Sequence, residues 1–196
     1  MPYSADHKQR TRALIVECAR TLFNRKGFIE VSIDEIMASA GLTRGGFYNH
    51  FKTKEELFME AVATYQDFSP TDRWPELDFD PARCGTAFAR QVVDAYLSRE
   101  HLDDIEGQCP MIALPSDVAR AGPGVKRAYC GLLERMAGMF AQSVDAPADA
   151  QASRRRGLAL AALCVGGMVL ARTIDDDAFR EEIRAAARAT AHEMIG

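Results

Sequence analysis

Residues 32–54 read SIDEIMASAGLTRGGFYNHFKTK, and this stretch decides the fold. Its apolar residues recur three and four positions apart on both sides of an Ala-Gly-Leu-Thr segment at 40–43, which is the spacing of two short helices. Gly41 permits the backbone reversal that sets two such helices at a steep angle. Ser32 precedes the first helix and Thr43 precedes the second, both in the position of an N-cap. The stretch is therefore predicted to be a helix-turn-helix.

The second helix of this pair, expected to run to about residue 50, has an apolar and a polar face. Phe47 and Phe51 lie one turn apart and should face inward, whereas Gly45 and Asn49 point the opposite way on a helical wheel. Each glycine in a helix costs about 0.8–1 kcal/mol relative to alanine, and such local violations tend to mark functional sites. A glycine backbone can approach a DNA groove closely. The neighbouring side chains carry hydroxyl, guanidinium, amide, imidazole and ammonium groups, which are hydrogen-bond donors suited to phosphate oxygens and base edges. We therefore predict that the DNA-binding residues are Ser32, Thr43, Arg44, Gly45, Gly46, Tyr48, Asn49, His50 and Lys54.

The charge of the chain is divided unevenly. Residues 1–54 hold nine Lys or Arg and five Asp or Glu, a net charge of +4, whereas residues 55–196 carry −8. A basic head on an acidic body is typical of a DNA-reading module joined to a regulatory domain. The polar first ten residues contain no apolar signal-peptide segment, and the most apolar run, 158–171, is too short to span a bilayer. We therefore expect a cytoplasmic protein with no membrane partner.

Helical spacing of apolar residues continues along the whole chain, so the fold class is predicted to be all-α. A first helix is expected over residues 6–26, closed by Gly27, and a fourth should begin at Thr53. The proline-rich residues 69–81 then break the pattern. Later helices are expected over residues 82–97, 109–120 with a proline interruption, 124–144, 150–174 and 177–194.

Residues 10–62 resemble the N-terminal region of TetR family transcription regulators. The pattern tyrosine-x-histidine-phenylalanine-x-x-lysine is intact from Tyr48 to Lys54. One departure is that many members have a single glycine and a lysine where this chain has Arg44-Gly45-Gly46. The resemblance further rests on Leu22-Phe23, Gly27-Phe28, Ser32-Ile33, Ile36, Ala40-Gly41-Leu42, Arg44 to Phe51 and Lys54 to Leu57.

This resemblance implies a domain organisation and a function. A three-helix, helix-turn-helix DNA-binding domain would occupy residues 1–53, and a helical effector-binding and dimerisation domain would occupy residues 54–196. The protomer would form a homodimer through its last two helices and bind double-stranded operator DNA with an inverted repeat. The function expected from the resemblance is that of a repressor released by a small-molecule effector.

The helix expected over residues 150–174 is apolar on nearly every side. Large apolar residues alternate with small ones such as Ala161, Gly166 and Gly167, which allow close helix approach. A helix of this kind must be buried all round, either in the core of the protomer or in a subunit interface. The pattern alone does not separate these two possibilities.

Aromatic and soft apolar residues in the body suggest an apolar effector pocket. Plain core packing is the alternative for each of them. An effector there could move the fourth helix and change the separation of two DNA-binding heads, provided that it binds one arrangement better than the other. We predict that the effector is small and largely apolar, with a contact set of Trp74, Phe88, Tyr96, Cys109 and Met111.

Cys109 offers a second mechanism, that of a redox or electrophile sensor. Pro110 favours a first helical position, which would put Cys109 at a helix N-terminus, where the dipole and free amides stabilise a thiolate. A buried, inert cysteine is the alternative. The five cysteines are odd in number and contain no C-x-x-C spacing, which argues against a disulfide framework and a zinc site. Cys18, Cys130 and Cys164 fall on apolar faces and are interpreted as core residues.

Two other classes of protein fit the sequence less well than a regulator. An enzyme is disfavoured because the chain has no G-x-S-x-G, H-E-x-x-H, Walker or G-x-G-x-x-G motif. A protein-binding adaptor would be expected to show a more apolar recognition face. No catalytic residue, metal site or cofactor is predicted. The acids 175–177 are interpreted as an N-cap for the last helix, and His7, His101 and His192 are assigned no role.

Overall fold

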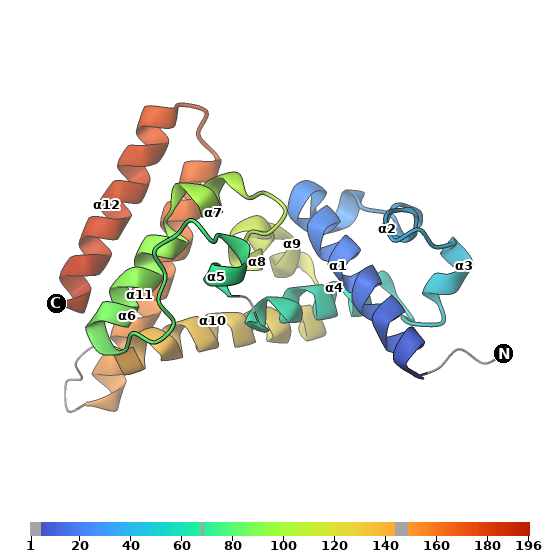
Figure 1. Ribbon diagram of the computed structural model, residues 1–196, viewed down its shortest axis with the longest axis horizontal. Helices are drawn as coiled ribbons and strands as arrows, with labels where there is room; N and C mark the ends of the chain where they lie inside the picture. Colours follow the sequence, from blue (N-terminus) through green and yellow to red (C-terminus); the bar gives the residue numbers. More distant parts are fainter. Residues whose placement is uncertain (1–4, 68, 144–148) are drawn as a thin grey trace.

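The computed structural model describes residues 5–67, 69–143 and 149–196, and the regular structure within these ranges is entirely helical. The molecule is elongated (Figure 1). Helices α2 (Ile33–Ser39) and α3 (Arg44–Phe47) lie at one end, and α12 (Asp177–Ile195) lies at the opposite end. The predicted all-α class is confirmed.

The head is built from α1 (Ala5–Glu30), α2 and α3, and α4 (Lys54–Ala63) packs against it. An aromatic cluster fills the space between α1 and α4. The ring of Phe58 lies 5.1 Å from that of Phe23 and 4.7 Å from that of Phe28, measured between centroids. Since Phe58 belongs to α4, this helix completes the core of the head.

Gly27 ends the regular part of α1. Its φ of 80° lies in the left-handed region that favours glycine, and its ψ of 168° breaks the helical geometry. The predicted closing position of the first helix is thereby confirmed. Residues 28–30 form a last short turn beyond this kink, so the chain reaches α2 with its direction changed.

The body is a bundle of helices that runs from the head to α12 (Figure 1). Helix α10 packs against α4 and α11, and α12 packs against α11 and α6. The remaining elements are the 3-10 helix η1 (Thr64–Asp67) and the α-helices α5 (Pro70–Arg73), α6 (Gly85–Tyr96), α7 (Arg99–Asp103), α8 (Pro110–Ala113), α9 (Pro115–Arg120), α10 (Pro123–Ser143) and α11 (Ala150–Arg172).

The boundaries differ from the sequence-based expectations in three places. Helix α3 ends at Phe47 instead of continuing to residue 50, because two glycines weaken so short a helix. Helix α5 lies inside the stretch interpreted as a break, with Pro70 at its first position. Helix α7 is not predicted by the sequence pattern, and Val144, the expected end of α10, lies outside the described residues.

Candidate DNA interface and effector pocket

The helix-turn-helix is held by local capping and by one positive-φ glycine. Ser32 caps α2, its hydroxyl oxygen accepting from the Glu35 N–H at 3.1 Å. Gly41 has a φ of 68°, and the next residue, Leu42, donates its N–H to the Met37 carbonyl oxygen at 2.8 Å. Thr43 precedes α3 as expected, but its side chain makes no capping hydrogen bond. The turn therefore depends on Gly41 and on backbone hydrogen bonds.

The two adjacent glycines of α3 have different surroundings. A Cβ at Gly45 would meet nothing within 4 Å, and the residue is exposed. A Cβ at Gly46 would lie 3.6 Å from Cε of Met37, against α2. Gly45 is therefore the position where the α3 backbone is open to an approaching surface. Gly46 belongs to the packing between the two helices, which corrects its predicted outward role.

Behind α3 the inward face is apolar, as predicted. Phe47 and Phe51 are fully buried, whereas Tyr48 is 59% exposed and Asn49 is exposed as well. Arg44 is also exposed and forms an ion pair with Asp34 of α2. Exposed Thr43 and Ser32 complete this surface, so most of the predicted DNA-binding set lies on the outside of the head.

His50 departs from the predicted outward position. It is half-buried, its backbone carbonyl oxygen accepts from the Arg12 guanidinium, and its ring Nδ1 is buried without a hydrogen-bond partner. Burial lowers the pKa of the imidazole, and the nearby cations Lys8 and Arg12 lower it further. His50 is therefore a neutral, partly buried residue beside the recognition surface.

Lys54 is turned inward, which corrects its predicted place on the DNA-facing side. Its ammonium donates to the carbonyl oxygens of Phe28 at 2.7 Å and Val31 at 2.8 Å. It also lies 4.2 Å from the centroid of the Phe28 ring. Partial burial lowers the pKa of this lysine. The orphan carbonyls that follow α1 need a donor, and Lys54 supplies it from the start of α4.

All five predicted effector contacts, Trp74, Phe88, Tyr96, Cys109 and Met111, line one cavity of about 390 Å³. They come from three separate segments, which are the end of α5, α6 and the start of α8. The remaining lining is mostly apolar and includes Leu132, Met136 and Met139 of α10. Arg135 is the one permanently charged residue of this lining. The lining residues were thus identified from aromatic and sulfur-containing composition alone, although their convergence required the fold.

His101 also lines this cavity, although no role is predicted for it from its polar sequence context. Its Nε2 accepts from the backbone N–H of Cys109 at 3.2 Å, so its Nδ1 carries the proton and donates to the Tyr96 carbonyl oxygen at 2.8 Å. Burial lowers the pKa of His101 to about 4. His101 is therefore neutral, and its two hydrogen bonds link Tyr96 to Cys109 in the pocket wall.

Cys109 does not have the environment predicted for a thiolate. The residue is fully buried, and α8 behind it has only four residues. Burial raises the pKa of its thiol to about 11. The neighbouring Tyr96 hydroxyl and the amides of Met111 and Ile112 lower it only in part. The expected low-pKa sensor cysteine is therefore not supported. Of the cysteines interpreted as core, Cys164 is buried, Cys18 is half-buried and Cys130 is exposed.

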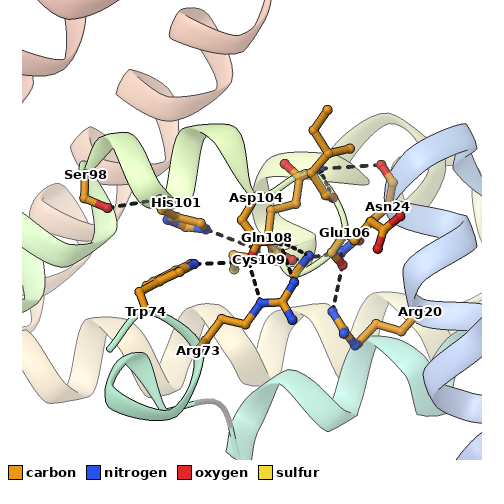
Figure 2. A network of polar contacts seen from close by, with 12 residues as sticks. Arg20, Asn24, Arg73, Trp74, Ser98, His101, Asp104, Glu106, Gln108 and Cys109 are labelled. Atoms are coloured by element: carbon orange, nitrogen blue, oxygen red, sulfur yellow. Dashed lines mark hydrogen bonds and ion pairs between the residues drawn. The ribbon is translucent and has the colours of Figure 1, made fainter. Parts of the chain in front are cut away.

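Residues 104–109, here called the strap, connect the pocket wall to α1 of the head (Figure 2). On the pocket side, the Asp104 carboxylate accepts from the Trp74 indole at 3.1 Å and from Arg73. On the head side, the Asn24 amide donates to the carbonyl oxygens of Glu106 at 2.9 Å and Gln108 at 3.0 Å. The strap therefore has hydrogen-bonded partners in both parts of the molecule.

The hairpin of α11 and α12 carries a shallow groove of small and apolar side chains, which includes Gly166, Leu170 and Ala187. Leu170 is 56% exposed in the protomer, whereas Met168 of the same helix is fully buried. The N-cap of α12 is Asp176, whose carboxylate accepts from the Phe179 N–H at 2.9 Å, as predicted. Helix α11 is therefore buried on one side only, and its other side is available for a partner.

Two kinds of feature are missing from the described ranges. Residues 5–67, 69–143 and 149–196 contain no group of three or more His, Cys, Asp or Glu placed to hold a metal ion. Over the same ranges, no helix is long and apolar enough to cross a bilayer.

Comparison with known proteins places the head in a family. The model for bacterial regulatory proteins, tetR family, matches residues 15–61. The uncharacterized HTH-type transcriptional regulator YfiR of Bacillus subtilis is 37% identical over 62 residues, which are 32% of this chain and 30% of the relative. The HTH-type transcriptional regulator AcrR of Shigella flexneri is 46% identical over 52 residues, 26% of this chain and 24% of the relative. The match covers less than a third of the length of both relatives.

Solved structures extend the likeness to the whole fold. The reduced form of Escherichia coli NemR superposes with a TM-score of 0.71 at 16% identity, over 95% of this chain and 97% of that one. A TetR transcriptional regulator from Legionella pneumophila gives 0.70 at 18% identity, over 97% and 99%. At these identities the likeness concerns the fold alone. Residues 15–61 thus match the tetR family of bacterial regulatory proteins, and the rest of the chain shares the all-helical fold of the solved structures.

Proposed function

We propose that the protein is a dimeric, DNA-binding repressor whose hold on an inverted-repeat operator is released by a small, largely apolar effector. The observation that carries DNA binding is the surface of α3. Arg44, Tyr48 and Asn49 are exposed there beside an open glycine, Gly45, while the opposite face is fully packed. A surface of this composition offers donors to base edges and phosphates and lets the helix backbone come close to DNA.

A dimer is supported by the one-sided burial of α11. Exposed Leu170 and open Gly166 lie on the same groove as residues of α12, so a second copy could pack there closely. This face is remote from α3 in the protomer (Figure 1). A two-fold dimer joined at this end would present two heads to half-sites separated by one or more turns of the DNA helix.

The effector follows from the chemistry of the cavity. Its volume of about 390 Å³ lies within the range of small-molecule sites, and its lining is dominated by aromatic and methionine side chains. Arg135 is exposed to solvent, so the buried part of the lining provides no permanent charge for an ionised ligand. Burying an unpaired charge is costly, and an uncharged apolar molecule therefore fits best.

The test of DNA binding begins with selection of bound fragments from a random DNA pool by the purified full-length protein. Replacing Arg44 or Asn49 by Ala should weaken binding to the selected site by about 1–3 kcal/mol and binding to random DNA by less. The control is Arg155→Ala, which removes an exposed cation from α11 at the far end of the molecule. Failure to select any sequence, or equal losses for all three variants, would refute sequence-specific reading by α3.

A further inference from the structure

The strap is attached to the effector pocket at both of its ends. At the first end, Asp104 accepts from the indole of Trp74 at 3.1 Å. At the other, the backbone N–H of Cys109 donates to Nε2 of His101 at 3.2 Å. Trp74 and His101 both line the cavity, and their rings lie 4.7 Å apart between centroids. A ligand that displaces either ring must therefore move the strap or break one of these two hydrogen bonds.

The middle of the strap is attached to α1. Carbonyl oxygens of Glu106 and Gln108 both accept from the side-chain amide of Asn24, and Glu106 also accepts from Arg20 at 2.9 Å (Figure 2). Asn24 is 6% exposed and Gln108 is fully buried, so water is excluded from the contact between these two residues, whereas Glu106 is exposed. Gln108 is held in addition by the guanidinium of Arg172 from α11.

The energetic consequence follows from burial. A buried polar group that loses its partner costs about 1–3 kcal/mol, whereas a rigid shift of hydrogen-bonded groups together costs less. Displacement of Trp74 or His101 would accordingly shift residues 104–109, which are hydrogen-bonded to both. Because Asn24 is hydrogen-bonded to residues 106 and 108, α1 would shift with them. Along this route two hydrogen bonds, from Trp74 to Asp104 and from Asn24 to Glu106, connect the pocket wall to the head.

Resting on the proposed function, we propose that the strap transmits occupancy of the pocket to α1, with Asn24 as the residue that couples the two. Helix α4, which is followed at once by the pocket residue Tyr65, provides a competing route. The two routes differ in one respect: only transmission through the strap requires the amide of Asn24.

The experiment uses the full-length protein and the uncharged dye N-phenyl-1-naphthylamine as a pocket probe. Quenching of Trp74, the single tryptophan of the chain, reports dye binding. Hydrogen exchange of the backbone amides is then measured with and without dye, without DNA. In the wild type, the dye should change exchange at least two-fold both in the strap and in residues 20–27 of α1. In Asn24→Leu, the change in the strap should remain and the change in α1 should fall at least two-fold, with the exposed side-chain contacts of Arg20 and Arg25 with Glu106 still joining α1 to the strap.

Two further variants make the result decisive. Arg25→Ala removes an exposed ion pair to the Glu106 side chain at 3.2 Å and should behave as the wild type. Arg20→Gln weakens a contact to the same backbone carbonyl as Asn24 and should reduce the α1 response in part, which keeps the test valid if Asn24→Leu fails to fold. Absence of the α1 response in the wild type, an undiminished α1 response in the folded Asn24→Leu variant, or absence of dye binding would each overturn the proposal. DNA selection remains a separate test of the proposed function.

Discussion

The ammonium of Lys54, at the start of α4, donates to the carbonyl oxygen of Phe28 at 2.7 Å and lies over the ring of the same residue at 4.2 Å. One side chain thus joins α4 to the end of α1 by a charged hydrogen bond and a cation–π contact. This relationship changes the role expected for the lysine from DNA ligand to structural clamp. It also ties α4 to the segment that leads from α1 into α2.

Replacing Lys54 by Met should lower the free energy of unfolding by about 1–3 kcal/mol, since two charged hydrogen bonds to carbonyls are lost. The measurement is urea-induced unfolding at constant protein concentration. The salt dependence of DNA binding should keep its slope. The matched control, Lys52→Ala, removes an exposed lysine two residues earlier and should leave stability within about 0.5 kcal/mol of the wild type. A slope that flattens by about one in Lys54→Met would instead assign the lysine to a phosphate.

Alanine at Gly45 and at Gly46 should have the same effect on stability but different effects on DNA binding. Both positions can accept a Cβ, and each substitution should stabilise the head by about 0.4–1 kcal/mol. The methyl group at 45 points outward and should reduce operator affinity several-fold. The methyl group at 46 points towards Met37 and should leave affinity unchanged. Equal losses of affinity in a titration by fluorescence anisotropy would argue against close approach of the backbone at Gly45.

Charges placed on the two sides of α11 should separate the proposed interface from the core. Gly166→Asp introduces a carboxylate where a Cβ meets open space, so the protomer should remain folded and become monomeric. Met168→Asp places the charge in the fully buried core and should unfold the protein. Light scattering and circular dichroism distinguish these outcomes. A folded Gly166→Asp dimer at micromolar concentration would remove the α11 groove from the interface.

His101 should make stability depend on pH. Its pKa is lowered to about 4 in the folded protein, against about 6.5 in an unfolded chain, so the unfolded state binds the proton first as pH falls. The contribution of the neutral imidazole is fully present above pH 6.5 and is lost towards pH 4. Unfolding free energies measured at pH 7 and pH 5 should differ by about 2 kcal/mol on this account. In His101→Gln, whose side chain does not titrate, the difference in unfolding free energy between pH 7 and pH 5 should be smaller by about 2 kcal/mol. An unchanged difference would show that other groups cause the pH dependence.

The sequence was sufficient to predict the helical class, the helix-turn-helix and the composition of the pocket. Each depends on local spacing or on residue type: Phe47 and Phe51 are one turn apart, and Trp74, Phe88 and Met111 are characteristic of apolar lining. The errors at His50 and Lys54 concern polar residues whose partners are distant in the chain. Lys54 meets carbonyl oxygens more than twenty positions earlier, and no periodicity carries that information.

His101 and Asn24 illustrate the same limit. His101 lies on a polar segment and is buried because Trp74 and Tyr96, from other elements, enclose its ring. Asn24 is a polar residue near the end of α1, and its partners follow some eighty positions later. In both cases burial of a polar group is compensated by hydrogen bonds that only the tertiary fold supplies.

The packing of Phe58 between Phe23 and Phe28 has a consequence for anyone who exchanges parts between regulators of this kind. A chimera cut after residue 53 would transplant the recognition helix while leaving behind Lys54, Leu57 and Phe58, which close its hydrophobic core and its α1 terminus. The smallest transferable unit therefore ends beyond Val62, and it carries with it Asn24, whose buried amide needs carbonyl acceptors in the recipient body in place of those of Glu106 and Gln108.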